Sequence, residues 1–114
     1  VIGGDFNTKQ NQEDCLSTLD TAVVTDAPFP ADSNGNIFTN GLRTKHYDYV
    51  FASASLASLS VPVVVGGNTF VNGLVVDTRI YNPISDLFPA LSTDSGATNM
   101  NHMAIVKDFV VNRK

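Results

Sequence analysis

Three groups of polar residues lie at the ends of apolar segments that predict β-strands. The first segment, "VIGG", runs into Asp5 and Asn7; "HYD" at 46–48 opens a second; Asn101 and His102 precede a third, "MAIVKDF". Loops at the ends of regular elements carry many binding and catalytic side chains. Carboxylates, amides and imidazoles in such places can hold a metal ion or a phosphate oxygen, or move a proton.

Asp5 and Asn7 are two residues apart at the end of the first predicted strand. If the extended backbone continues through Asn7, both side chains point to the same side, because side chains alternate along a strand. A carboxylate and an amide placed together could hold a metal or a phosphate oxygen. The alternative is a turn between the strand and the next helix, stabilised by the Asp or Asn side chain. The local sequence leaves both interpretations open.

Asp48 lies in an apolar, aromatic strand, where a carboxylate needs a partner to offset its loss of hydration. A histidine is the natural partner, since an Asp–His pair orients the ring and raises its basicity. Lys45 or Arg43 would be the partner if Asp48 stood on an edge strand. His102 is accordingly either the partner of such a pair or a structural histidine.

For three further residues the sequence gives simpler predictions. His46 is expected to be exposed at the start of its strand. Tyr47 either hydrogen-bonds a phosphate oxygen or packs at the rim of the core. Cys15 is predicted to be a buried, inert thiol in a helix. As the single cysteine of the chain, it excludes an internal disulfide and a cysteine-built zinc site.

Composition narrows the possible classes of protein. With 114 residues, 43% of them hydrophobic, and a net charge of −4, we expect one globular domain without the basic footprint of a non-specific nucleic-acid binder. No apolar run approaches the ~20 residues of a membrane helix, so we expect a soluble protein with no transmembrane segment. A mature secreted bacterial protein would look the same, and the compartment stays open.

The pattern of apolar residues and turn formers predicts a strand-rich domain with few helices. Strands are predicted at 1–4, 21–25, 46–53, 61–65, 74–80 and 103–111, a helix at 12–19 capped by Thr8 or Asn11, and a short helix at 85–91. Residues 26–45, with a small hairpin at Asn34-Gly35, and residues 82–101 are predicted to be irregular. The first strand is expected to be buried and to lack its beginning. Several strands are too apolar for water on either side, so helices should cover one face of the sheet and another structure the second.

The three motifs, in this order, resemble the C-terminal half of the endonuclease/exonuclease/phosphatase superfamily, the deoxyribonuclease-I-like group. The motifs are "GDFN" at 4–7, "YDYV" at 47–50 and "NH" at 101–102 before an apolar strand. The resemblance implies an α+β fold: half of a four-layered α/β/β/α sandwich, with one mostly antiparallel sheet and helices on one face. Residues 1–114 would be the C-terminal half of the domain, and the N-terminal half would be its partner.

The resemblance also implies a role for each motif residue. His102 would be the general base that takes a proton from the attacking water, and Asp48 would orient its ring. Asp5 would position the nucleophile or help to bind the metal. Asn7 would donate to a phosphate oxygen, with Tyr47 as a second donor to the substrate. Mg²⁺ or Mn²⁺ would act as a Lewis acid.

The implied function is a divalent-metal-dependent phosphoesterase, a hydrolase that cleaves phosphodiesters, either a nuclease or a related phosphodiesterase. The substrate would be nucleic acid or a small phosphodiester, and the chain would be a fragment that is inactive alone. Asn101 stands where the family has an aspartate that supports the metal. It keeps an oxygen ligand but lacks the charge that a hard cation favours, so metal binding should be weakened. The alternative function is a degenerate, non-catalytic member that binds a phosphorylated ligand.

Overall fold

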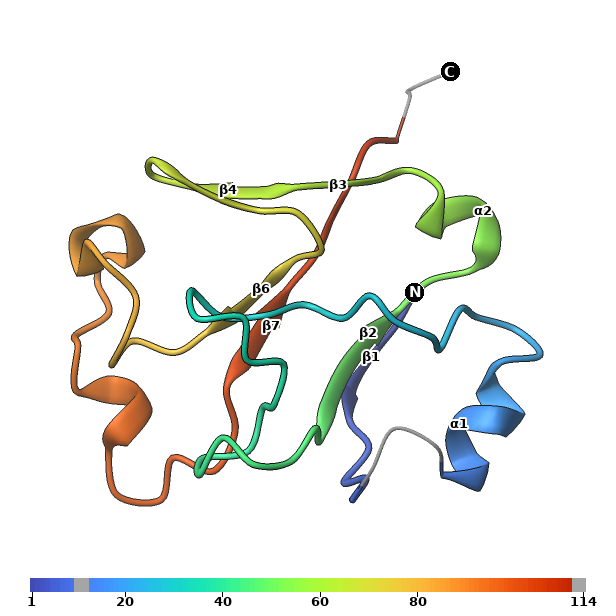
Figure 1. Ribbon diagram of the computed structural model, residues 1–114, viewed down its shortest axis with the longest axis horizontal. Coiled ribbons are helices and arrows are strands. Elements are labelled where there is room, and N and C mark those ends of the chain that lie inside the picture. The colour runs from blue at the N-terminus through green and yellow to red at the C-terminus, as the bar shows by residue number, and fades with distance from the viewer. Residues whose placement is uncertain (10–12, 112–114) are drawn as a thin grey trace.

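A computed structural model describes residues 1–9 and 13–111 (Figure 1). Within these ranges the chain forms short strands, two α-helices and two 3₁₀-helices. In order they are β1 (Ile2–Asp5), α1 (Asp14–Leu19), β2 (Asp48–Phe51), α2 (Ala54–Ala57), β3 (Ser60–Val61), β4 (Val63–Val65), β5 (Asn68–Phe70), β6 (Leu74–Val76), η1 (Ile84–Leu87), η2 (Asp94–Gly96), β7 (Ala104–Val106) and β8 (Asp108–Phe109).

The strands pair antiparallel in four small ladders: β1–β2, β3–β8, β4–β5 and β6–β7. The β1–β2 and β6–β7 ladders adjoin near the middle of the molecule, where β2 packs beside β7 (Figure 1). The predicted α+β class is therefore confirmed. The described strands form four two-stranded sheets in place of the single sheet that was expected.

The first core lies on one face of the β1–β2 ladder. Tyr49 and Phe51 alternate onto this face and pack with Leu16 of α1 and with Val23. Because alternate residues of a strand point to opposite faces, Asp48 and Val50 project from the other side. A second core joins Val63, Leu74 and Tyr81, whose hydroxyl donates to the Val65 carbonyl at 2.9 Å.

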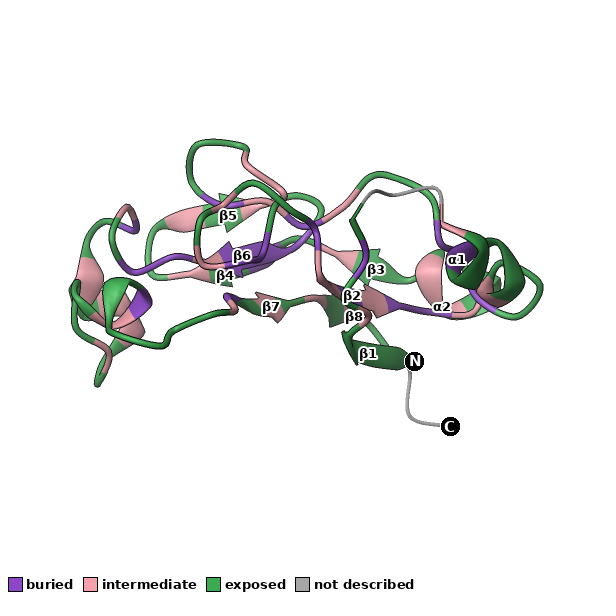
Figure 2. Ribbon diagram, turned by 90° about the horizontal axis from the view of Figure 1, so that it is seen from below, coloured by how far each residue is buried: buried purple, intermediate pink, exposed green. Residues whose placement is uncertain are grey.

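The first strand is present, but the prediction that it is buried is wrong. All four residues of β1 are exposed (Figure 2), because β1 is an edge strand that pairs only with β2 among the described residues. Cys15 is also exposed, against expectation. The helix begins at Asp14 with Glu13 as N-cap, while Asn11 lies outside the described residues. Thr8 is not the cap; its buried hydroxyl donates to the His46 carbonyl.

Two predicted strands are interrupted. Residues 61–65 divide into β3 and β4 at Pro62, which has no N–H to donate to a ladder. Residues 103–111 divide into β7 and β8 at Lys107, where the chain leaves β6 for β3. The predicted strand at 74–80 stops at Val76.

Other local predictions fail where turns decide the backbone. Residues 21–25 form a turn with a single bridge, Val24 to Ala52, in place of a strand. β5 was not predicted; Gly66-Gly67 closes the β4–β5 hairpin, with Gly66 at φ 57°. The predicted helix at 85–91 is the 3₁₀-helix η1.

The long loop 26–45 is confirmed apart from isolated bridges at Ala31 and Asn40. Asn34-Gly35 makes a tight turn without flanking strands. The molecule measures 39 × 37 × 20 Å, so it is a flat slab. Of the helices in the described ranges, none has the length and apolar character to cross a bilayer.

Candidate functional site

The β1–β2 ladder brings two carboxylates together. Asp5 is the last residue of β1 and Asp48 the first of β2, and the register places them directly opposite each other. Directly opposed residues of two strands project to the same face and lie close together. Like charges in such a position repel.

A buried threonine connects β2 to the segment that carries His102. The Thr39 hydroxyl accepts hydrogen bonds from the backbone N–H groups of Tyr47 and Asp48, each at 2.9 Å. The Thr39 carbonyl accepts from the N–H of Met103 at 2.7 Å, and Asn40 forms a bridge with His102. Because Thr39 contacts both segments, it fixes His102 beside the start of β2.

His102 lies between the two carboxylates. Its Nδ1 is 3.0 and 3.2 Å from the two Asp48 carboxylate oxygens, and its Nε2 is 3.8 Å from Asp5 Oδ2. An ionised carboxylate only accepts hydrogen bonds, so a neutral ring carries its proton on Nδ1 and presents the Nε2 lone pair. The His102 and Asp5 side chains are 40% and 47% exposed, so both are accessible to solvent.

The pairing of Asp48 with a histidine, predicted from the sequence, is thus present. The alternative partners are engaged elsewhere. Arg43 pairs with Asp32 and, at 3.2 Å, with Asp77. Lys45 places its ammonium 6.0 Å from the centre of the Tyr47 ring.

The turn expected as an alternative at Asp5 and Asn7 is also present. The Asn7 N–H donates to Asp5 Oδ1 at 2.7 Å, and Asn7 has a φ of 49°. The extended backbone therefore ends before Asn7, and the expectation that both side chains point to the same side does not hold. Asp5 serves both features, since its Oδ2 faces His102 while Oδ1 closes the turn.

The two aromatic residues before Asp48 differ in position. The Tyr47 ring is half-buried with its centre 5.8 Å from that of His102. His46 is 2% exposed, so the prediction of an exposed histidine is wrong. It stacks on Tyr49 at 4.0 Å, with the Phe29 ring edge-on. Burial lowers the pKa of His46 to about 4, against the opposing effect of Asp48.

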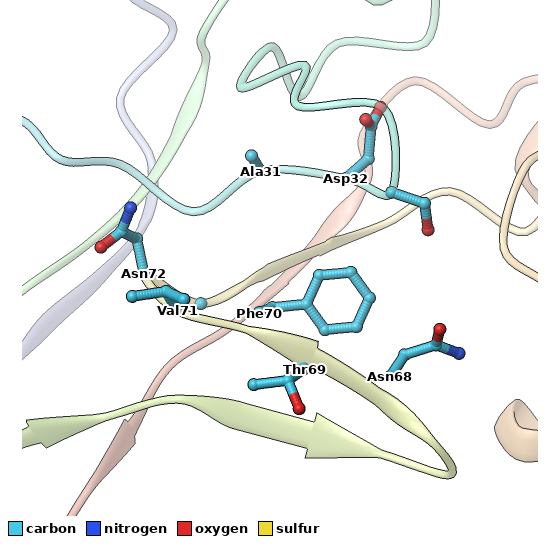
Figure 3. A pocket seen from close by; sticks show the side chains of 9 residues that line it. Ala31, Asp32, Asn68, Thr69, Phe70, Val71 and Asn72 are labelled. Carbon is cyan, nitrogen blue, oxygen red and sulfur yellow. The ribbon is translucent and has the colours of Figure 1, made fainter.

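A groove of about 580 Å³ opens beside the cluster formed by Asp5, Asp48 and His102. Its lining includes His102, Tyr47 and Asn101, which is exposed and whose carbonyl accepts from the Gly41 N–H at 2.8 Å. It also includes Arg79, which the sequence did not single out. A separate hollow of about 330 Å³ beside the β4–β5 hairpin (Figure 3) contains no residue of the cluster.

The cluster is chemically able to do two things. Asp5, Asp48 and His102 each offer one ligand atom, and these atoms lie within 4.8 Å of one another. Imidazole with carboxylates suits ions such as Zn²⁺ or Mn²⁺ better than Mg²⁺, which prefers oxygen ligands alone. Alternatively, a histidine oriented by one carboxylate acts as a base on a molecule held near the other.

The chain matches no known family model, no curated protein and no solved structure.

Proposed function

We propose that this chain contributes the general base of a divalent-metal-dependent phosphoesterase that hydrolyses phosphodiesters, as a nuclease or related phosphodiesterase. The observation that carries the proposal is the alignment of Asp48, His102 and Asp5. Asp48 fixes one ring nitrogen of His102 at 3.0 Å, and the other faces Asp5 at 3.8 Å. This arrangement supplies an oriented base beside an exposed carboxylate, at the mouth of a groove.

In the proposed reaction, a water molecule is held by both Nε2 and Asp5 Oδ2. Nε2 and Asp5 Oδ2 are 3.8 Å apart, so one water oxygen can lie at a hydrogen-bonding distance of about 2.8 Å from both. Nε2 takes a proton as the water oxygen bonds to phosphorus, and the bond from phosphorus to the leaving oxygen breaks. The leaving oxygen takes a proton from solvent, and protonated His102 releases its proton to solvent and returns to its neutral form. Asn7 and Tyr47 are proposed donors to the phosphate.

Two residues near His102 offer the oxygen ligands that a hard divalent cation prefers. Mg²⁺ is commonly held through one or two carboxylates, with waters and substrate phosphates completing its shell. Asp5 is an exposed carboxylate of this kind. Asn101, the residue directly before His102, offers a side-chain amide oxygen. These two residues would hold Mg²⁺ or Mn²⁺, which would act as a Lewis acid on the phosphate.

The proposal includes a second half of the domain. The chain exposes 7045 Å², whereas a monomer of this mass is expected to expose roughly 6100 Å². Val1 and Val106 add apolar surface, at 70% and 36% exposed. We propose that the missing half of a four-layered sandwich covers this surface and contributes further metal ligands.

The test is hydrolysis of bis-p-nitrophenyl phosphate by the natural protein that contains this chain, with magnesium and with a chelator. We expect magnesium-dependent release of nitrophenol that falls by about a hundredfold or more in His102→Gln. Lys107→Gln, which changes a side chain outside the cluster, is the control and should be unaffected. Magnesium-dependent turnover that survives in His102→Gln would show that His102 is not the base.

Asn101 favours a second candidate, a non-catalytic protein that binds a phosphorylated ligand. A neutral amide at this position provides less negative charge for a cation than a carboxylate would. This candidate predicts that inorganic phosphate or a phosphodiester binds near His102 with no turnover at any magnesium concentration. Calorimetric titration beside the hydrolysis assay separates the two functions.

A further inference from the structure

The groove beside His102 has an unusual charge for this protein. The chain has a net charge of −4, yet none of the described residues that line the groove is acidic. The permanently charged side chain in its lining is that of Arg79. The hollow beside the β4–β5 hairpin, in contrast, is lined by Asp32.

Arg79 is held in place by a buried acid. Its Nε and one terminal nitrogen donate to the two oxygens of Asp77 at 2.7 and 2.6 Å. Asp77 is 3% exposed in its side chain, whereas the Arg79 side chain is 34% exposed. Asp77 also forms an ion pair with Arg43, whose side chain is 11% exposed and which pairs in turn with the buried Asp32. The acids of this ion-pair group are thus shielded, and its exposed charge is the Arg79 guanidinium.

Arg79 keeps donors for a ligand. A guanidinium has five N–H donors; two go to Asp77 and a third reaches the Gly41 carbonyl at 3.3 Å. Within the described residues, the other two have no protein acceptor. Burial alone would raise the pKa of Asp77, but the hydrogen bonds and charges of Arg79 and Arg43 lower it, so the carboxylate stays charged and holds Arg79 in position.

The groove connects Arg79 to the cluster through short contacts. Gly41 accepts from Arg79 and donates to the carbonyl of Asn101, the residue before His102. The groove wall at Ser95, beside Arg79, is fixed by a reciprocal pair of hydrogen bonds, each 2.9 Å long, between Thr78 and Ser95. The volume of about 580 Å³ lies within the range of sites for small ligands. Tyr47 adds an aromatic ring of the kind on which bases stack.

We propose that this groove seats a nucleic-acid strand and that Arg79 binds the phosphate next to the one hydrolysed at His102. The inference rests on the proposed phosphodiesterase function and names its substrate class. A guanidinium with free donors binds phosphate oxygens well. A second phosphate is present in an oligonucleotide and absent from a small diester, so Arg79 would distinguish the two.

The test compares a dinucleotide, which has one phosphodiester, with a trinucleotide, which has two. We expect the wild type to cleave the trinucleotide with a kcat/KM about tenfold higher or more. Arg79→Gln should remove this advantage through KM and leave the dinucleotide within about twofold, with Arg79→Lys intermediate. Lys107→Gln, which removes the same charge outside the groove, should keep the advantage. Equal loss on both substrates, or no loss on either, would overturn the proposal.

A second variant protects the test against misfolding of Arg79→Gln. Ala97 is exposed and lines the groove without touching the Arg79–Asp77 pair in any hydrogen bond. Ala97→Glu should repel the second phosphate and lower the trinucleotide preference, and Ala97→Gln is its neutral control. If both variants behave alike, the groove does not bind a phosphate.

Binding is measured separately by the fluorescence anisotropy of a labelled trinucleotide. Binding that depends on Arg79 without any hydrolysis would contradict the proposed catalytic function and support the groove assignment. Hydrolysis of the trinucleotide without dependence on Arg79 would support the catalytic function and contradict the groove assignment.

Discussion

The contact between Asp48 and His102 determines which tautomer of the His102 ring is expected. Because Asp48 accepts from Nδ1, neutral His102 should carry its proton there, and Asp48→Asn should shift the ring toward a mixture of tautomers. The chain has two histidines, so ¹⁵N NMR of the imidazoles resolves both. Asp108→Asn, an equal charge loss on β8, should leave the spectrum of His102 unchanged. A ring protonated mainly on Nε2 in the wild type would contradict the proposed role of Nε2 as base.

A second residue-scale prediction concerns Asn101. Replacing it by Asp adds a negative charge next to His102, and a carboxylate attracts a divalent cation more strongly than an amide does. We expect the magnesium concentration for half-saturation to fall by about fivefold or more in Asn101→Asp, as measured by hydrolysis or calorimetry. The matched control is Asn99→Asp, since Asp tolerates the positive φ of 69° there. An unchanged half-saturation in Asn101→Asp would show that position 101 does not support the metal.

At this scale the sequence predicted some residues of the site and missed others. The pairing of Asp48 with a histidine follows from a local rule, since a carboxylate among apolar residues needs a partner. His46 was wrongly placed at the surface because its burial depends partly on Phe29, which packs on it from the distant loop 26–45, in addition to the nearby Tyr49. Arg79 was missed because its relation to His102 passes through Gly41, and no local pattern shows such a contact.

At the scale of elements, the close approach of Gly41 to the segment before β7 should be essential. A Cβ at Gly41 would lie 2.6 Å from the Met100 carbonyl, so Gly41→Ala must push the two segments apart. We expect a loss of about 1–3 kcal/mol in the free energy of unfolding and a shift in the imidazole signals of His102. Gly67→Ala is the control, because nothing lies within 4 Å of its added Cβ. A Gly41→Ala protein with the stability and His102 signals of the wild type would show that this contact does not position the site.

The boundaries of the strands show how far local patterns reach. The alternation of aromatic with small or polar residues at 46–53 correctly predicted β2, yet the apolar, β-branched "TAVVT" at 21–25 forms a turn. Strand formation needs a partner as well as propensity, and this segment finds one only at Val24. The break at Lys107 likewise reflects the change of partner from β6 to β3, which the sequence of one segment does not reveal.

At the scale of the whole molecule, the sequence predicted an α+β class but not the arrangement of four separate ladders. The expected covering of the second face of the sheet stays a prediction. Which residues become buried is also a property of the whole fold. His46 shows this clearly, because its burial ties the charge state of one ring to the stability of the entire molecule.

Stability should therefore depend on pH through His46. Burial lowers the pKa of His46 to about 4 from an ordinary value of 6.5, so between these values the unfolded chain binds a proton that the folded chain does not. The free energy of unfolding then rises with pH. This contribution is fully present above the unfolded pKa and is lost as the pH falls toward 4. The expected loss between pH 7.5 and 4.5 is about 2.5 kcal/mol.

Urea unfolding at these two pH values, compared between variants, isolates the effect of His46 from that of the carboxylates. His46→Phe keeps an aromatic ring for the stack on Tyr49 but cannot be protonated, so its loss between pH 7.5 and 4.5 should be smaller than that of the wild type by about 2.5 kcal/mol. The control is His102→Gln, which removes the other, partly exposed histidine and should retain the full pH dependence of the core. If His46→Phe lost as much stability as the wild type, the pH dependence would have to come from other groups, because the buried ring would then have no part in it.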